Sequence, residues 1–226
     1  MKYNNIHKGF FLSRPNRFIA QVEIDGIEHT VHVKNTGRCR ELLTDRAEVF
    51  LEKSNNPNRK TQYDLIGVRK GDLLVNMDSQ APNKVVKEFL EAGGVFKDLE
   101  FLKPETVFES SRFDFYGIHG GKKFYMEVKG VTLENDGIAS FPDAPTERGI
   151  KHLNELVKAV SRGYEGYVFF LIQMSGVKYF EPNDITHKAF GDALRNAKKN
   201  GVKVLCYDCK VFENRLEIGG KVNIKM

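Results

Sequence analysis

The pattern of apolar residues changes near residue 82, and this change constrains the fold more than any other feature of the chain. Before it, short runs alternate between apolar and polar residues, as half-buried strands do, and Asp25-Gly26 between two of them is a hairpin signal. The strand-like runs are 18–24, 27–33, 47–52, 63–68 and 73–77. Five short strands in residues 1–81 predict a small β-barrel of the OB type, although an SH3-like barrel would give a similar pattern.

After residue 82 the pattern becomes mixed. Helical periodicity is expected over 83–92, 146–162 and 184–200, with Asn83 and Thr146 as N-caps of the first two helices. Nearly continuous apolar runs at 167–172 and 202–207 are typical of strands covered on both faces. Residues 82–226 are therefore predicted to form a second domain, of the α/β class, with a mixed sheet flanked by helices.

The overall composition sets only broad limits on function. A chain of 226 residues is long enough for two domains with cores of their own, and no apolar run is long enough to span a membrane. We find no signal-peptide pattern, and three cysteines cannot complete a disulfide framework, so a cytoplasmic location is expected. The net charge of +5 permits a polyanionic partner without requiring one.

Two strand-like runs carry the candidate chemistry. Asp114 lies in the first, and Glu127-Val128-Lys129 ends the second, after a turn that contains Gly120-Gly121. Because residues i and i+2 of a strand share a face, Glu127 and Lys129 are predicted to lie together, with Asp114 joining them from the neighbouring strand. Two carboxylates and an ammonium in this arrangement can hold a hard divalent cation beside a nucleophilic water. Alternatively, these side chains are ordinary solvated residues, since a D…ExK spacing also arises by chance.

The roles expected at this site follow from phosphodiester hydrolysis. Asp114 and Glu127 would bind Mg²⁺ or Mn²⁺, and the carbonyl group of Val128 would add a backbone ligand. Lys129 would position or help to deprotonate the water, or offset the charge of the phosphate.

Several blocks of the sequence, in order along the chain, carry a resemblance to a known family. They are NTGR at 35–38, NNPNRKT at 55–61, RFDF at 112–115, EVKGVT at 127–132, FPDAPT at 141–146 and KHL at 151–153. In these blocks the chain resembles the sugar fermentation stimulation protein A family. The resemblance implies an OB-fold domain followed by a PD-(D/E)xK nuclease-like domain, and DNA binding. One position departs from the wider nuclease pattern, because Phe113 rather than proline precedes Asp114.

Three further residues are weaker candidates for shaping the site. Glu88 resembles an acidic residue that some such nucleases carry on the preceding helix, but it also fits an exposed helical glutamate. Asp143, between Pro142 and Pro145, is a turn former, a helix-start anion or a metal ligand. Gln173 either reaches the site or serves as a core amide.

Basic residues near two expected barrel loops suggest a track for nucleic-acid phosphates. They are Arg14, Arg17, Lys34, Arg38, Arg40, Arg59 and Lys60, and Arg148 and Lys151 begin the long helix beside the expected metal site. Phosphate contacts of this kind would give salt-dependent DNA binding with little sequence preference. Acidic residues are interleaved with them, however, so a mixed solvated surface explains the same pattern.

Three functional hypotheses follow from the sequence. The first is a DNA-binding protein whose second domain hydrolyses phosphodiesters with a divalent metal. The second is a non-catalytic DNA-binding transcriptional regulator of sugar metabolism of the maltose type. The third is a metalloenzyme that acts on a small phosphorylated metabolite. The sequence leaves the oligomeric state open.

Overall fold

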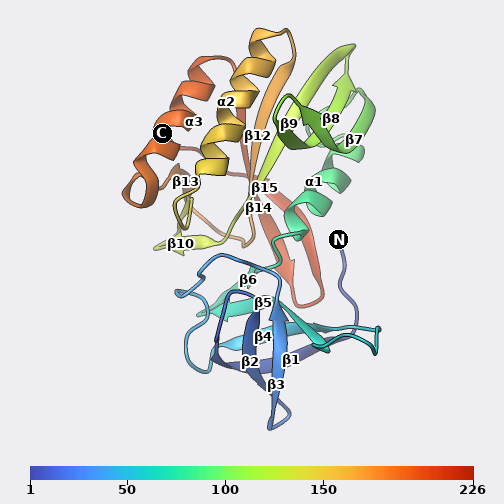
Figure 1. Ribbon diagram of the computed structural model, residues 1–226, viewed down its shortest axis with the longest axis vertical. Helices are drawn as coiled ribbons and strands as arrows, with labels where there is room; N and C mark the ends of the chain where they lie inside the picture. Colours follow the sequence, from blue (N-terminus) through green and yellow to red (C-terminus); the bar gives the residue numbers. More distant parts are fainter.

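Five of the first six strands form a closed barrel in the computed structural model, which describes residues 1–226 (Figure 1). The six strands are β1 (Ile6–Ser13), β2 (Ile19–Ile24), β3 (Ile27–Val33), β4 (Glu48–Lys53), β5 (Tyr63–Lys70) and β6 (Leu73–Asn76). Neighbours run in the order β1-β2-β3-β5-β4 and return to β1, because β3 pairs in parallel with β5 and β4 pairs with β1. Closure removes the free edges of these five strands, and the predicted OB-type barrel is confirmed.

The strand that closes this barrel, β1, was not predicted. Its residues do not alternate cleanly, because Phe10 is 44% exposed while the neighbouring buried position is Gly9, which has no side chain. A side chain at Gly9 would lie 2.6 Å from the carbonyl oxygen of Glu23, so close strand packing requires glycine there. The predicted run 73–77 corresponds to β6, which pairs with β5 outside the closed ring.

The second domain contains a six-stranded sheet in the order β15-β14-β12-β9-β8-β7. Its strands are β7 (Leu99–Phe108), β8 (Ser111–His119), β9 (Lys122–Val131), β12 (Glu165–Ile172), β14 (Lys203–Phe212) and β15 (Arg215–Lys221). The three central strands β9, β12 and β14 are parallel, and the outer strands are antiparallel to their neighbours. The mixed sheet was therefore predicted correctly, whereas β7 was not anticipated.

Helices cover both faces of this sheet (Figure 1). On one face, α1 (Ala81–Glu91) packs through Val85 and Leu90 against Phe169 of β12. On the other, α2 (Glu147–Ser161) and α3 (Asp184–Lys199) lie side by side over the opposite core, which includes Val168 and Phe170. A small sheet of β10 (Leu133–Asn135), β11 (Ile138–Phe141) and β13 (Tyr179–Pro182) lies beside them. None of the three helices combines the length and the apolar run needed to cross a membrane.

The helix starts agree with the sequence in one case and differ in the other. Thr146 caps α2, since its side-chain oxygen accepts a hydrogen bond from the backbone N–H of Gly149 at 3.1 Å. The prediction of Asn83 as a cap was wrong, because α1 begins two residues earlier, after Gln80, with Pro82 in its first turn. The side chain of Asn83 is therefore free to reach the sheet.

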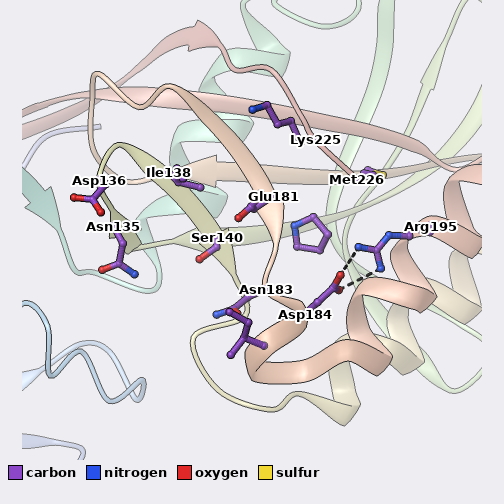
Figure 2. Close-up of a pocket in the computed structure, with 12 residues that line it drawn as sticks. Asn135, Asp136, Ile138, Ser140, Glu181, Asn183, Asp184, Arg195, Lys225 and Met226 are labelled. Carbon is purple, nitrogen blue, oxygen red and sulfur yellow. Dashed lines mark hydrogen bonds and ion pairs between the residues drawn. The ribbon is translucent and has the colours of Figure 1, made fainter.

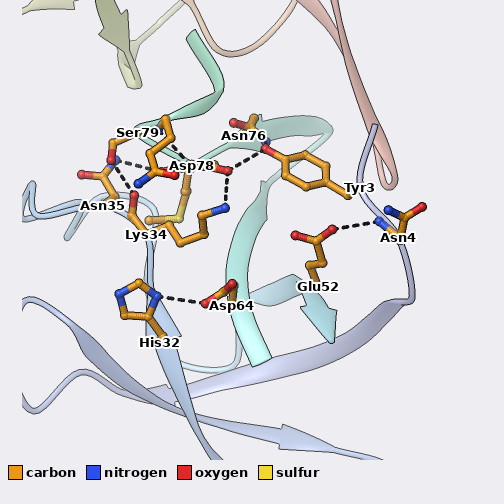
Figure 3. Close-up of polar contacts among 12 residues, drawn as sticks. Tyr3, Asn4, His32, Lys34, Asn35, Glu52, Asp64, Asn76, Asp78 and Ser79 are labelled. Carbon is orange, nitrogen blue, oxygen red and sulfur yellow. Dashed lines mark hydrogen bonds and ion pairs between the residues drawn. The ribbon is translucent and has the colours of Figure 1, made fainter. Parts of the chain in front are cut away.

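Polar contacts gather around Asp78, where the chain leaves the barrel (Figure 3). The fully buried carboxylate of Asp78 accepts from Lys34 Nζ at 2.8 Å and from the Tyr3 hydroxyl group at 3.2 Å. Beside it, Gln173, which follows β12, donates through Nε2 to the carbonyl oxygens of Asn76 and Asp78 at 3.1 and 3.0 Å. These contacts fix the barrel at the carboxyl ends of the parallel strands, where α/β sheets commonly bind ligands.

Candidate metal and nucleic-acid site

The antiparallel pairing of β8 and β9 changes character at Asp114. The two strands pair regularly from His119↔Lys122 to Phe115↔Met126, as the glycine turn predicted. Beyond this point the side-chain alternation breaks, because Phe113 and Phe115 pack into the cores on opposite faces of the sheet. Asp114 Oδ2 accepts a hydrogen bond from the backbone N–H of Val128 at 2.7 Å. This break is what brings the Asp114 carboxylate to β9.

Glu127 is the centre of the polar contacts at this site. Its Oε1 atom accepts from Lys129 Nζ at 2.6 Å, which confirms that the two residues share a face of β9. The same oxygen accepts from Nδ1 of His152, which lies on α2. The Glu127 side chain is only 6% exposed, yet its second oxygen, Oε2, is buried without any hydrogen-bond partner. One carboxylate oxygen is thus heavily paired and the other is left unsatisfied.

The two carboxyl groups differ in their ionisation. Burial, together with the nearby charge of Glu127, raises the pKa of Asp114 above its ordinary value. Burial would also raise the pKa of Glu127, but the hydrogen bond from His152 and the charge of Lys129 outweigh it and hold that pKa below the usual range. Glu127 is therefore the more firmly ionised member of the pair. Opposite shifts of neighbouring groups are a common property of functional sites.

Two residues that the sequence analysis missed hold this pair, one from each side of the sheet. Asn83 of α1 donates through Nδ2 to Asp114 Oδ1 at 2.7 Å. His152 of α2 is 4% exposed; its Nδ1 faces Glu127, and its Nε2 lies 3.4 Å from Arg148 Nε. A histidine on the buried face of α2 was an available sequence signal, whereas Asn83 resembled an ordinary cap.

The residues present fit a divalent cation that keeps part of its water shell. No group of three or more His, Cys, Asp or Glu side chains is close enough to hold a metal alone. Mg²⁺, however, is commonly bound through one or two carboxylates, with waters and substrate phosphates completing the octahedron. Asp114 and the unsatisfied Oε2 of Glu127 provide that minimal donor set. Nothing in the geometry selects the Val128 carbonyl as a ligand, and this role stays a prediction.

The weaker site candidates take different places. The carboxylate of Glu88 pairs with the N-terminal ammonium of Met1 at 2.7 Å and is 61% exposed, so it does not join the Asp114–Glu127 pair. Gln173 is 1% exposed and is engaged as the core amide described above. Asp143 lies in the loop before α2, with Oδ2 beside Gly37 of the barrel, where a side chain on Gly37 would approach it to 2.6 Å.

Several of the basic residues expected to bind nucleic acid are already engaged. Arg59 forms a two-fold hydrogen bond with Asp64, at 2.9 and 2.6 Å, which neutralises its charge within the barrel. Arg14 donates to the backbone carbonyls of Arg17, Asn35, Gly37 and Arg38, and so fixes two loops. Lys151 donates to the carbonyl of Ser110 at 2.8 Å. Exposed Lys60 makes no ion pair.

Other arginines lack such partners. Arg17, Arg38 and Arg40 are exposed, form no ion pair with a carboxylate, and line a pocket of about 300 Å³ on the barrel, with Phe11 and Leu43 as its apolar part. The lining includes no acidic residue. The acidic residues near these arginines, Glu41 and Asp143, therefore lie outside the lining of this pocket.

Comparisons with known proteins agree with this two-domain description. Residues 80–215 match the family described as "Sugar fermentation stimulation protein RE domain", and residues 12–77 match "SfsA N-terminal OB domain". The chain belongs to the sugar fermentation stimulation protein family.

Members of this family are similar along the whole chain. A homolog from Desulfitobacterium hafniense (strain DSM 10664 / DCB-2) is 60% identical over 226 residues, which is 100% of this chain and 99% of the relative. One from Clostridium beijerinckii is 58% identical over 224 residues, with 99% of both chains covered. The structure of Pyrococcus furiosus SfsA in complex with Ca²⁺ superposes with a TM-score of 0.92 at 22% identity, covering 100% of this chain and 98% of that one. This last match shows the shared fold.

Proposed function

We propose that this family member binds DNA through residues 1–81 and hydrolyses its phosphodiester bonds at a divalent-metal site in residues 82–226. The observation that carries this proposal is the buried, unsatisfied Oε2 atom of Glu127, a residue whose charge raises the pKa of Asp114. An unpaired buried carboxylate oxygen is destabilising by about 1–3 kcal/mol or more, so a bound partner would stabilise it. Glu41 and Glu155 also carry such an oxygen, but only Glu127 has a charge that raises the pKa of a neighbouring buried carboxyl group, Asp114. A hard cation is the partner that two carboxylates and no sulfur or free imidazole would select.

The chain's own residues then have distinct tasks. Asp114 and Glu127 would hold Mg²⁺ or Mn²⁺, which when bound lowers the pKa of water and polarises the phosphoryl group. Lys129 keeps an ammonium at 2.6 Å from Glu127 Oε1, where it can orient the attacking water or donate to a phosphate oxygen. Arg148, exposed at the start of α2 and adjacent to His152, can hold the phosphate on the neighbouring side.

The related Pyrococcus furiosus protein was solved with Ca²⁺, a cation that shares the preference of Mg²⁺ for oxygen ligands. That likeness supports a hard divalent cation for this chain. The unpaired arginines of the barrel support a polyanionic partner, and contacts to phosphates alone would give binding with little sequence preference. Both proposed partners, a divalent cation and DNA, are consistent with a cytoplasmic location.

A second candidate is a DNA-binding regulator of sugar metabolism without catalysis. Two observations favour it: the name of the family, and the lack of a third acidic or histidine ligand beside Asp114 and Glu127. Both candidates use the barrel in the same way, so they differ only in whether the second domain cleaves what the first one binds.

The experiment that separates them compares cleavage and binding in one series. The protein is incubated with single-stranded, duplex and branched DNA and with RNA, each in Mg²⁺, Mn²⁺ or EDTA. Glu127→Ala is the test variant, and Glu88→Ala, which removes an exposed glutamate outside the site, is its matched control. We expect metal-dependent cleavage by the wild type and by Glu88→Ala, and none by Glu127→Ala. Unaltered binding with no cleavage of any substrate would support the regulator instead.

A further inference from the structure

A second pocket lies between the barrel and the sheet domain, directly beside the candidate site. It encloses about 310 Å³, at the lower end of the range of about 300–1,000 Å³ that is typical of small-ligand sites. Gly130 lines it and follows Lys129 directly in β9, so the pocket begins about 10 Å along the strand from Glu127. The opposite wall comes from Thr36 and Gly37 of a barrel loop. Both domains are needed to form this pocket.

A side-chain acceptor atom without a hydrogen bond to the protein borders this space. Gln173 is 1% exposed, and its Nε2 donates to Asn76 O, Asn76 Oδ1 and Asp78 O, which fixes the orientation of its amide. The remaining oxygen, Oε1, lies against Gly130, where an added side-chain carbon would meet it at 2.4 Å. This oxygen makes no hydrogen bond within the protein and borders the pocket. An amide oxygen held in a fixed orientation at a pocket wall is suited to a ligand that carries an N–H or NH₂ group.

The rest of the lining suits a flat ring with polar edges. Phe141, Pro142 and Pro145 provide apolar walls, while Asp143 adds a carboxylate that forms no ion pair. Hydroxyl groups from threonine and serine side chains complete the lining. Acceptor groups around an apolar slot match the ring N–H and amino groups of a nucleobase. A base that is paired in a duplex has these groups engaged and cannot enter such a slot.

The pocket adjoins the arginine-lined pocket of the barrel, since Gly37 lines both. Most other arginines are paired with carboxylates: Arg46, Arg59, Arg69, Arg112, Arg162, Arg195 and Arg215. Arg17, Arg38 and Arg40 are not, so the unpaired guanidinium groups of the barrel gather at one end of the interdomain pocket. Guanidinium groups without carboxylate partners are well suited to phosphates.

Another pocket shows the contrast (Figure 2). It encloses about 470 Å³ between β11, β13 and the start of α3, and its only arginine, Arg195, is bound to Asp184. It therefore offers a phosphate no free guanidinium group, and it shares no lining residue with the metal site.

We propose that the pocket between the two domains receives one unpaired nucleobase of a DNA strand, while Arg17, Arg38 and Arg40 hold the adjoining phosphates. The strand then runs from the barrel past Gly130 to Asp114 and Glu127, and the substrate of the site is single-stranded or locally unpaired DNA. This inference rests on the proposed function only in requiring that the chain binds DNA. It adds the class of substrate and the pocket that selects it.

The test measures binding in EDTA, so that it does not depend on cleavage. The probes are a short fluorescent single-stranded oligonucleotide, the same sequence as a duplex and as RNA, and the single strand with one 2-aminopurine in place of a base. Ala144→Phe fills the pocket from its half-buried wall, and Thr36→Leu fills it from an exposed loop position. Ala92→Phe, at the exposed end of α1, is the matched control.

We expect the wild type to prefer the single strand and to raise 2-aminopurine fluorescence as the base leaves its neighbours. Losing the pocket for one base should weaken single-strand binding by about tenfold in Ala144→Phe, with a smaller loss in Thr36→Leu and none in Ala92→Phe. The affinity of the variants for the duplex should stay within about twofold of the wild-type value, because phosphate contacts provide duplex binding.

Equal affinity for single strand and duplex, or an unaltered 2-aminopurine signal in folded Ala144→Phe and Thr36→Leu, would overturn the pocket assignment. Tighter binding of the RNA probe would overturn DNA as the strand. The two proposals fail separately. If the protein prefers the single strand and gives the 2-aminopurine signal but cleaves nothing, only the proposal of hydrolysis is overturned. If it cleaves both DNA forms without this preference and signal, only the present inference is overturned.

Discussion

His152 is the residue whose replacement tests the candidate site most directly. It donates to Glu127 Oε1 from a position that is 4% exposed, and its ring packs edge-on against Phe113 at 5.9 Å between centroids. The hydrogen bond keeps Oε1 occupied, so that Oε2 is the oxygen left for a cation. We therefore regard His152 as a positioning residue that acts through Glu127.

His152→Phe keeps the ring and removes the donor, whereas His152→Asn keeps a donor on the equivalent δ atom and loses the ring. A hydrogen bond to a charged group contributes about 1.5–3 kcal/mol, and Lys129 remains as a partner of Glu127 at 2.6 Å. We expect the free energy of unfolding of His152→Phe to be about 2 kcal/mol lower than that of the wild type. Its affinity for Mn²⁺ should fall by about 10- to 100-fold, as is typical when a residue that supports a metal ligand is lost.

The assay is Mn²⁺ binding by titration calorimetry without DNA, alongside urea unfolding of each variant. A packing role alone predicts that His152→Phe, which fills the space, binds Mn²⁺ better than His152→Asn. A positioning role predicts the opposite order, with most of the affinity restored in His152→Asn. Wild-type affinity in folded His152→Phe would refute the assigned role.

Three further outcomes are expected. Burial and the charge of Glu127 raise the pKa of Asp114 above the ordinary value of 3.8, so the Mn²⁺ affinity measured by calorimetry should decline with falling pH before free aspartate titrates. A midpoint of this decline at or below pH 3.8 would contradict the expectation. Lys34→Met leaves the fully buried Asp78 without its cation and should lower the free energy of unfolding, measured in urea, by about 3–5 kcal/mol. A loss under about 1 kcal/mol would show that other groups stabilise the Asp78 carboxylate. Arg38→Ala should reduce the slope of log affinity for DNA against log salt concentration by about one. Arg59→Ala should leave that slope unchanged and destabilise the barrel, and equal slopes for the two variants would contradict the pairing of Arg59 with Asp64.

The prediction for Arg59 shows how charge alone misleads. The sequence placed Arg59 among the DNA-binding residues because it lies in a basic loop beside Lys60. Its partner Asp64 is only five residues away, but the loop has to fold back before the two side chains can meet. Whether a cation is free or neutralised depends on that path, which residue composition does not describe.

The same limit applies to the strand that was missed. Alternation predicts strands because side chains point to opposite faces, and β1 hides this alternation with Gly9 at a buried position and Phe10 at an exposed one. The need for glycine at position 9 becomes visible only when the carbonyl of Glu23 on β2 is in place. The barrel closes through β1, a strand that its own sequence pattern does not predict.

By itself the sequence determined the order of the two domains, the cap at Thr146 and the shared face of Glu127 and Lys129, because hairpin turns, helix caps and the two-residue period of a strand are local properties. Tertiary structure alone decided which donors reach the carboxylates. Asn83 is separated from Asp114 by 31 residues and His152 from Glu127 by 25, so neither contact exists until α1 and α2 pack on opposite faces of the sheet. That packing leaves Glu127 Oε2 unsatisfied, and no local pattern encodes it.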